Sequence, residues 1–254
     1  MKSISILLIS LLSLNYSCKK EETKVEPTPV VIDNPFTKTV EFESTDGLII
    51  TADHYHIDKT KPIIVLCHQA GSSRGEYKEI AVTLNSLGFN CLAIDQRSGN
   101  AVNGVTNETN AKAVTAGKAT GYNDSKQDVV SAVNWAKTYY NKNVILWGSS
   151  YSSSLALIVA AEEINVEKVL AFSPGEYLSP TVVSTSISSL NKPAFLTSAK
   201  NEKTQTSLLF NVISSTNKTQ FTPTGAGNHG SQALWTSRTD HAEYWVAVKT
   251  FLGV

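Results

Sequence analysis

The sequence predicts an α/β protein built on a doubly wound, mostly parallel sheet of about eight strands. Short apolar runs of strand length alternate along the chain with segments whose apolar residues recur at helical spacing. Such alternation is typical of parallel sheets covered by helices. The chain has 254 residues, which is enough for one large domain with a substantial core. We find no internal repeat and no second domain, and we place the domain at residues 39–254.

The elements of this domain can be predicted in order. Residues 39–44 and 48–57 flank the turn sequence Thr45-Asp46-Gly47 and indicate an antiparallel hairpin. Short apolar runs predict the later strands at 63–67, 91–94, 144–147, 169–172, 195–198 and 218–222. Apolar spacing predicts helices at 76–87, at 124–139 and at 151–163, and a closing helix within 231–252.

The first residues are expected to be a targeting segment rather than part of the fold. Lys2 supplies a positive charge, and residues 4–14 form an apolar stretch that is too short to span a bilayer stably. Residues 1–17, followed by Cys18, resemble a bacterial lipoprotein signal peptide. The resemblance implies a lipidated Cys18 and an exported protein anchored to a membrane of the bacterial cell envelope. Ordinary secretion with an incidental cysteine is the alternative, and residues 18–38 are expected to form a flexible tether.

Composition argues against some kinds of partner and cofactor. The 22 Lys and Arg residues balance 22 Asp and Glu residues, and no long basic stretch occurs, so a nucleic-acid partner is not expected. No CxxC or HExxH spacing is present, and we expect neither a metal nor an organic cofactor. Cys67 and Cys91 end and begin neighbouring predicted strands, about 10 Å apart along the sheet, so two buried free thiols are expected.

The most informative segment is an apolar strand, Ile145-Leu146-Trp147, that leads into Gly148-Ser149-Ser150-Tyr151-Ser152 and then into a helix. A strand-to-helix turn this sharp exposes its central serine and needs small residues two positions before and after it. Gly148 and Ser152 meet this demand, although Ser152 stands where glycine is commoner. Ser150 is therefore a candidate nucleophile. A serine-rich helix start is the alternative interpretation, because serine is a preferred N-cap.

Other motifs follow and precede this turn in a characteristic order. They are His68-Gln69-Ala70-Gly71-Ser72-Ser73, Ile94-Asp95-Gln96-Arg97-Ser98-Gly99, Lys192-Pro193-Ala194-Phe195-Leu196-Thr197-Ser198-Ala199-Lys200-Asn201-Glu202 and Gly225-Ala226-Gly227-Asn228-His229-Gly230. Together with the turn at Ser150 they resemble the α/β-hydrolase fold over residues 39–254, and most closely small carboxylesterases and the dienelactone-hydrolase group. Because dehalogenases and epoxide hydrolases use an Asp nucleophile and dienelactone hydrolases proper use Cys, Ser150 implies a serine hydrolase.

The resemblance implies a catalytic triad of Ser150, Glu202 and His229, in the chain order that the fold imposes. A serine hydroxyl needs an adjacent base, and histidine can take the proton and return it to the leaving group. A carboxylate must then orient the imidazole. Glu202 stands where the family more often has Asp, and Glu176 is the alternative acid.

An oxyanion hole needs two backbone donors aimed at the developing negative charge. Tyr151 follows the nucleophile directly and is expected to supply one. The loop after His68 is expected to supply the other, from the N–H of Ala70 or, less favourably, of Gln69. His68 itself resembles the family's loop histidine, which implies a structural role in holding this loop.

Several other polar residues are expected to be structural. Asp95 and Arg97 are expected to form an ion pair with each other. His54 and His56 share one face of a strand, and because no third ligand is evident we expect a solvated hairpin face rather than a metal site. His241 is expected to pack in the last helix or to lie at the surface.

The sequence carries less information on the substrate. The interval 172–192 is too short for a large lid, so the site should be fairly open. Residues 98–123 are expected to be a loop that forms one wall of the pocket, or else a mobile surface loop. Tyr122, Tyr177 and Trp235 are candidate pocket aromatics, with a place in the core as the alternative. We expect cleavage of small or medium carboxylic esters through an acyl-enzyme, and the alternatives are a peptidase, a thioesterase or a catalytically silent binding protein on the same fold.

Overall fold

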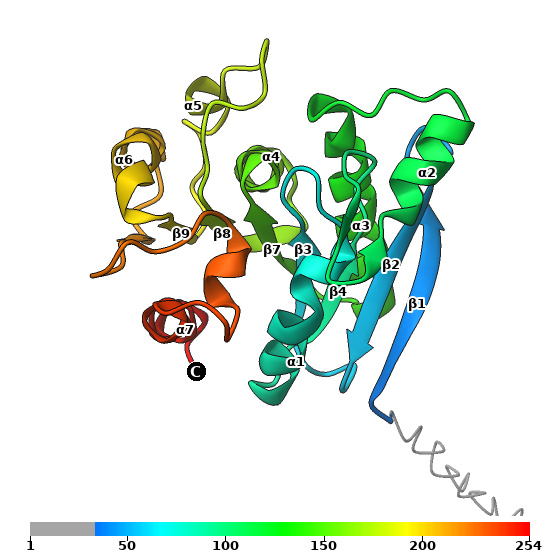
Figure 1. Cartoon of the computed structure of the whole chain (residues 1–254), viewed down its shortest axis with the longest axis horizontal. Helices are drawn as coiled ribbons and strands as arrows, with labels where there is room; N and C mark the ends of the chain where they lie inside the picture. Colours follow the sequence, from blue (N-terminus) through cyan, green and yellow to red (C-terminus); the bar gives the residue numbers. More distant parts are fainter. Residues whose placement is uncertain (1–33) are drawn as a thin grey trace, which may run out of the picture. The chain divides into compact units, whose positions relative to one another are not determined.

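A mostly parallel sheet forms the centre of the domain (Figure 1). The computed structural model describes residues 34–254. Across the sheet the strands are β1 (Phe36–Glu43), β2 (Ile49–His56), β4 (Asn90–Ile94), β3 (Ile63–Cys67), β7 (Val144–Ser149), β8 (Val166–Phe172), β9 (Ala194–Thr197) and β10 (Lys218–Phe221). β2 is antiparallel to its neighbours β1 and β4, and the remaining pairs are parallel. The predicted fold class and the predicted hairpin are confirmed.

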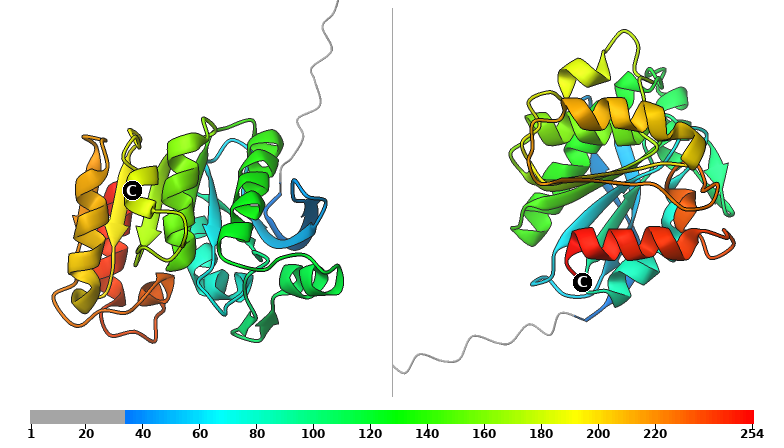
Figure 2. Two further views of the ribbon diagram at one scale, coloured as in Figure 1. Left: turned by 90° about the horizontal axis from the view of Figure 1, so that it is seen from above. Right: turned by 90° about the vertical axis from the view of Figure 1, so that its left-hand side faces the viewer.

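Helices cover both faces of the sheet (Figure 2). One face is covered by α3 (Lys126–Tyr140), α4 (Tyr151–Glu162), α5 (Val183–Ser186) and α6 (Lys203–Val212). The opposite face is covered by α1 (Lys78–Ser86) and α7 (His241–Leu252). On β3, Ile63, Val65 and Cys67 face the first group of helices, whereas Ile64 and Leu66 face the second. Because both faces are buried, the strand is apolar at every position, and this explains the continuous apolar runs in the sequence.

The segment between β4 and α3 contains more regular secondary structure than the loop that we expected at 98–123. It contains β5 (Ala101–Val102) and β6 (Val105–Thr106), which pair with each other, then α2 (Glu108–Thr115) and the short 3-10 helix η2 (Asn123–Ser125). The Asn107 side chain caps α2 by accepting the N–H of Asn110 at 2.7 Å. Only Thr109 and Ala113 of α2 are buried, so its sequence has no apolar periodicity that would have predicted a helix.

The two ends of the domain differ slightly from expectation. β1 begins at Phe36, so residues 36–38 belong to the sheet rather than to the tether placed at 18–38. The predicted signal peptide, Cys18 and the tether up to residue 33 lie outside the described residues. The closing helix predicted within 231–252 is divided into a 3-10 helix, η4 (Ser231–Leu234), and α7. Within residues 34–254, no helix is both long enough and apolar enough to cross a membrane.

Cys67 and Cys91 are buried free thiols, as predicted. In the register of β3 and β4, Cys91 lies opposite Ile64, three residues before Cys67. Burial raises the pKa of both thiols. Neither is therefore a thiolate at neutral pH, and neither is a candidate nucleophile.

The solvated face that we expected at His54 and His56 is wrong. Both residues are buried, at 0% and 1% exposure, because the aromatic end of α3 covers them. The Tyr140 hydroxyl oxygen lies 2.6 Å from Nε2 of His54 and 2.8 Å from Nδ1 of His56, and Trp135 meets the His54 ring edge-on. Burial lowers the pKa of His54 to about 4. Tyr140 comes 86 positions after His54 and 84 after His56 in the chain, so the hairpin sequence alone gives no sign of this cover.

Candidate active site

A sharp turn between β7 and α4 presents Ser150. β7 ends at Ser149 and α4 begins at Tyr151, and the residue between them has φ 58° and ψ −124°. A positive φ is uncommon for a residue other than glycine, and such strain concentrates at functional sites. Gly148 is required here, because a Cβ at this position would lie 2.3 Å from the carbonyl oxygen of Ser152. The predicted strand-to-helix turn is present.

Ser152, at the position where glycine is commoner, contributes a hydroxyl group to the turn. This hydroxyl accepts the N–H of Ser149 at 3.0 Å. Its oxygen also lies 2.7 Å from the carbonyl oxygen of Cys67 and 2.9 Å from that of Ser149. The side chain therefore links the turn to the end of β3 instead of merely fitting in the available space.

The structure brings Ser150, His229 and Glu202 into one hydrogen-bonded line. Nε2 of His229 lies 2.8 Å from Oγ of Ser150, and Nδ1 of His229 lies 2.5 Å from Oε1 of Glu202. Ser150 follows β7, Glu202 ends the 3-10 helix η3 (Lys200–Glu202) after β9, and His229 lies between β10 and η4. The three side chains meet because the carboxyl ends of parallel strands lie at the same edge of a sheet.

Ser173, which the sequence analysis did not identify, links the acid to the histidine loop. Its hydroxyl donates to Oε2 of Glu202 at 2.7 Å and accepts the N–H of Gly230 at 2.9 Å. The N–H of Ala199 also donates to Oε2 of Glu202, at 3.1 Å. The only sequence signal for Ser173 is its place directly after the predicted strand at 169–172.

The contact between His229 and Glu202 shifts both pKa values in opposite directions. The hydrogen bond to Glu202 raises the pKa of His229 above its usual 6.5 despite partial burial, and the charges of Glu202 and Glu76 add to this effect. Burial disfavours the ionised form of Glu202, but the hydrogen bonds from His229 and Ser173 outweigh it and lower the pKa of Glu202. An ionised carboxylate thus lies beside an imidazole of increased basicity, as a general base requires.

The alternative acid, Glu176, lies elsewhere and has other partners. Its carboxylate accepts the N–H of Val183 at 2.7 Å and the N–H of Ser184 at 2.8 Å, where α5 begins. A carboxylate at this position stabilises the N-terminus of a helix. Glu202, and not Glu176, is the carboxylate that hydrogen-bonds to His229.

Comparison with known proteins identifies the fold. No family model matches the chain, and no curated protein matches its sequence. An α/β hydrolase, GrgF from a Penicillium species, matches with a TM-score of 0.63 and 12% identity, over 86% of this chain and 100% of its own. The chain has the α/β-hydrolase fold. A dienelactone hydrolase from Anabaena variabilis matches over 86% of this chain and 97% of its own, with a TM-score of 0.67 and 15% identity. The Pyrococcus furiosus esterase Pf2001 gives a TM-score of 0.67 at 19% identity, over 86% of this chain and 92% of its own.

In this α/β-hydrolase fold, His68 holds the loop after β3, as predicted. The ring is fully buried, and its Nε2 accepts the N–H of Gln96 at 3.1 Å. The other ring nitrogen, Nδ1, therefore carries the proton and donates to the carbonyl oxygen of Gln69 at 2.8 Å. Burial lowers the pKa of His68 to about 4, so the ring is neutral and its role is structural.

Of the two candidate oxyanion donors in this loop, the N–H groups of Gln69 and Ala70, the first is already engaged. The N–H of Gln69 already donates to Oε2 of Glu76 at 2.8 Å, which favours the N–H of Ala70 for the oxyanion. Tyr151 is the first residue of α4, where the backbone N–H groups and the helix dipole favour negative charge. Glu76 was not identified from the sequence, in which it stands as an ordinary polar residue in a predicted helix.

The expected ion pair between Asp95 and Arg97 is wrong. Arg97 pairs with Asp128, at 2.7 Å, and with Asp46, at 2.9 Å. Asp95 pairs with Arg74 instead, at 2.6 Å. β4 ends at residue 94, so the strand rule that places side chains two residues apart on one face does not extend to this pair.

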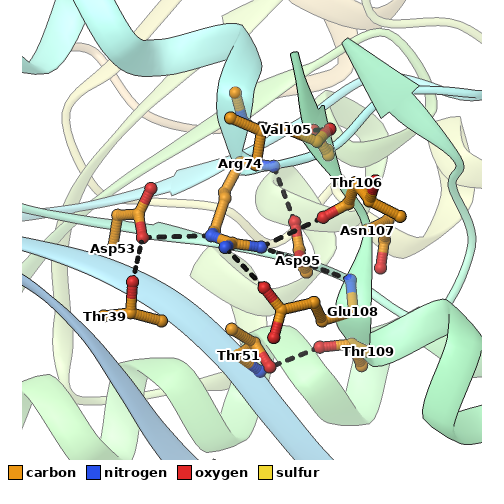
Figure 3. A network of polar contacts seen from close by, with 12 residues as sticks. Thr39, Thr51, Asp53, Arg74, Asp95, Val105, Thr106, Asn107, Glu108 and Thr109 are labelled. Atoms are coloured by element: carbon orange, nitrogen blue, oxygen red, sulfur yellow. Dashed lines mark hydrogen bonds and ion pairs between the residues drawn. The ribbon is translucent and has the colours of Figure 1, made fainter. Parts of the chain in front are cut away.

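Arg74 anchors the segment between β4 and α3 against the sheet (Figure 3). Its Nη1 donates to Oδ2 of Asp95 at 2.6 Å and to the carbonyl oxygen of Thr106 at 3.1 Å. Its Nε donates to Asp53 at 3.0 Å, and its Nη2 donates to Glu108 at 2.8 Å. One guanidinium therefore fixes both β6 and the start of α2, beside the loop that carries the candidate oxyanion donor.

Two of the three candidate pocket aromatics lie close to the site. Tyr122 is 39% exposed and stacks on the ring of Tyr151, with 4.3 Å between the ring centroids. The hydroxyl of Tyr177 donates to the carbonyl oxygen of Ser173 at 3.4 Å. Trp235 instead donates its indole N–H to the carbonyl oxygen of Glu76 at 2.9 Å, which is a structural contact.

A cavity of about 650 Å³ borders His229 and Glu202, between residues 199–202 and 226–229.

In the part of the chain that the structure describes, no group of three or more His, Cys, Asp or Glu side chains is placed to hold a metal ion. His241 begins α7 with its Nδ1 2.7 Å from the carbonyl oxygen of Arg238, and it is not part of the site.

Proposed function

We propose that this chain is a serine hydrolase that cleaves small or medium carboxylic esters through an acyl-enzyme intermediate. The observation that carries the proposal is the line from Ser150 through His229 to Glu202, with separations of 2.8 and 2.5 Å. Nucleophile, base and orienting carboxylate lie within hydrogen-bond reach of one another, as acyl transfer by serine requires. The shared fold with a dienelactone hydrolase and an esterase supports this class of reaction.

In the first half-reaction, Oγ of Ser150 attacks the ester carbonyl carbon while its proton moves to Nε2 of His229. The carbonyl oxygen becomes negative and receives hydrogen bonds from the N–H groups of Ala70 and Tyr151. Glu202 keeps the imidazole oriented and stabilises its protonated form. The bond to the alcohol then breaks, and His229 returns the proton to the departing alkoxide.

In the second half-reaction, a water molecule attacks the acyl carbon of the acyl-enzyme and gives one proton to His229. The bond between the acyl carbon and Oγ breaks, and Ser150 recovers its proton. The products are one carboxylic acid and one alcohol. No cofactor takes part in this scheme.

The surroundings of the triad favour substrates of small or medium size. Between β8 and β9 the chain has a single short helix, α5, of four residues, which is too little to form a large lid. The cavity of about 650 Å³ beside His229 and Glu202 is bordered by residues 199–202 and 226–229 and not by Ser150, so its volume does not measure the space for a substrate at the nucleophile. The ring of Tyr122, which is 39% exposed, stacks on the ring of Tyr151, the residue after Ser150.

The alternatives differ in how well this geometry supports them. A peptidase or a thioesterase would use the same tetrahedral chemistry, and only substrates distinguish them from an esterase. A silent binding protein on the same fold has no need of an aligned serine, histidine and carboxylate, so the hydrogen-bonded triad favours an enzyme.

Labelling with a fluorophosphonate, which reacts only with an activated serine, tests the proposal. Full-length protein purified in detergent should label, and the Ser150→Ala variant should not. p-Nitrophenyl esters of graded acyl length, with matched thioester and amide substrates beside them, would then define the class. Folded wild-type protein that neither labels nor hydrolyses any of these substrates would contradict the proposal and favour the silent binder.

We also propose that a lipid on Cys18 anchors the enzyme to the bacterial cell envelope as an exported protein. The resemblance of residues 1–17 to a lipoprotein signal supports this, and multiple acyl chains on one residue give stable membrane attachment. Growth of a bacterial host on an alkyne-bearing fatty acid should tag the wild-type protein but not Cys18→Ser. Equal tagging of both proteins, or of neither, would reject the anchor.

A further inference from the structure

A buried carboxylate, Glu76, lies between the loops that form the candidate active site. It belongs to the 3-10 helix η1 (Arg74–Tyr77) and is fully buried. Oε2 accepts the backbone N–H of Gln69 at 2.8 Å, and Oε1 accepts the hydroxyl of Ser149 at 2.7 Å. One side chain therefore binds both the oxyanion loop and the residue directly before the nucleophile.

The link continues from Ser149 to the loop that carries His229. The hydroxyl oxygen of Ser149 accepts the N–H of Ser231 at 2.8 Å. Packing at this point is close, because a Cβ on Gly230 would lie 2.6 Å from that oxygen and 2.7 Å from Oε1 of Gln69. Glu76 thus reaches the oxyanion loop and the nucleophile turn directly, and the histidine loop through one hydroxyl.

Both oxygens of Glu76 act as acceptors in this arrangement. A backbone N–H can only donate, so Oε2 accepts from Gln69, and Ser149, which accepts the N–H of Ser231, donates its own proton to Oε1. If Oε1 were protonated, the contact with Ser149 would reverse, with the second lone pair of the Ser149 oxygen as the acceptor. Two donors suit the ionised carboxylate, which needs such partners when it is buried.

The charge of Glu76 also acts on the base. Among the described residues, the ionisable groups that interact with Glu76 through its charge are His229 and Tyr77. Burial raises the pKa of Glu76 to about 7, although hydrogen bonds from Ser149 and Gln69 and the charge of His229 oppose the increase. In return, the negative charge of Glu76 contributes to the raised pKa of His229. Two carboxylates therefore act on the imidazole, Glu202 through a hydrogen bond and Glu76 through its charge alone.

We propose that Glu76 is a positioning residue for the hydrolysis, and this inference rests on the proposed function. By engaging the N–H of Gln69, its carboxylate fixes the loop so that the next N–H, that of Ala70, is the donor for the oxyanion. By binding Ser149, it fixes the nucleophile turn relative to the histidine loop. Glu76 touches neither substrate nor reacting atoms, and it acts only through these neighbours.

The variant Glu76→Gln tests this role with little change of shape. An amide carries no charge and offers a single acceptor, so it can keep the N–H of Gln69 only if its contact with Ser149 reverses or is lost. We expect kcat to fall about 10- to 100-fold with KM nearly unchanged, because a misplaced catalytic group costs rate rather than binding. We also expect the acid limb of the kcat/KM profile to move to lower pH, because His229 loses a negative charge beside it. NMR titration of the His229 ring should show the same downward change in its pKa.

Glu79→Gln is the matched control. This carboxylate lies three residues further along the chain, and it binds the backbone N–H and the hydroxyl of Thr236 at 3.1 and 3.0 Å, away from the triad. Its rate and pH profile should stay at wild-type values. If Glu76→Gln does not fold, Ser149→Ala removes the shared hydroxyl and should lower kcat in the same direction.

Failure of this inference can be told apart from failure of the proposed function. Wild-type protein that does not react with the fluorophosphonate would contradict both the proposed function and the role of Glu76. Reactive wild-type protein whose folded Glu76→Gln variant keeps its kcat, its pH profile and its His229 pKa would overturn the role of Glu76 alone. Should that variant not fold, a Ser149→Ala protein with wild-type kcat would overturn it too.

Discussion

Replacing Arg97 with methionine should destabilise the domain strongly. Arg97 and Asp128 are 1% and 0% exposed. The guanidinium donates to Asp128 through Nε at 3.0 and 3.1 Å and through Nη2 at 2.7 Å. Methionine retains the apolar stem but no charge, so the variant would leave the negative charge of Asp128 buried and without its cation.

The magnitude follows from what each contact contributes. Removing one partner of a buried ion pair costs about 3–5 kcal/mol of unfolding free energy. The second pair, with Asp46, is 29% exposed on the carboxylate side and adds roughly 0–1 kcal/mol. Asp128 keeps two donors in the variant, the hydroxyl of Ser44 and the backbone N–H of residue 97, each at 2.9 Å. Because these two donors remain, we expect the loss of unfolding free energy to lie at the lower end of this range, about 3 kcal/mol.

Urea unfolding followed by circular dichroism would measure this loss, and Lys126→Met is a matched control. Lys126 pairs with Glu162, but the two side chains are 38% and 47% exposed, so its loss should cost less than about 1 kcal/mol. Double-mutant cycles with Asp128→Asn and with Asp95→Asn would locate the partner of Arg97. A loss below about 1 kcal/mol, or a coupling of Arg97 to Asp95 as large as that to Asp128, would refute the reasoning.

Three further predictions concern the candidate site. Glu202→Gln should lower kcat by about 10⁴-fold, because an amide favours the wrong tautomer of His229, whereas Glu176→Gln should keep the wild-type rate in the same ester assay. The kcat/KM of the wild-type protein for an ester should fall as the pH drops through the pKa of His229, since the proposed base must be neutral, and that pKa lies above 6.5. A pH–rate profile with its acid limb below 6.5 would contradict the shift. Gly148→Ala would place a Cβ 2.3 Å from the carbonyl oxygen of Ser152, so thermal unfolding should show a loss of about 1–3 kcal/mol, and Ser150 should lose its fluorophosphonate labelling.

The order of elements could be predicted because it rests on short-range signals. Strands buried on both faces appear as continuous apolar runs, and β3, residues 144–147 of β7 and residues 169–172 of β8 are of this kind. The turn at Ser150 has a local steric cause, since Gly148 must admit the backbone of the following helix. Such constraints act between residues a few positions apart, and the sequence therefore displays them.

The partners of buried polar residues could not be predicted in this way. Arg97 and Asp128 are separated by 31 residues, and His54 and Tyr140 by 86. Each of these contacts depends on which helix covers which part of the sheet. A buried polar residue needs a partner wherever it lies, but its own neighbourhood in the sequence does not identify that partner.

Glu76 and Glu202 show why burial alone does not give a carboxylate its role. Both raise the pKa of the His229 imidazole. Glu202 touches Nδ1 and has a lowered pKa because the imidazole and Ser173 donate to it. Glu76 receives its donors from a backbone N–H and a hydroxyl, and burial dominates, so its pKa rises to about 7. The difference lies in what donates to each carboxylate, and it suits Glu202 to orient the base and Glu76 to hold the loops around it.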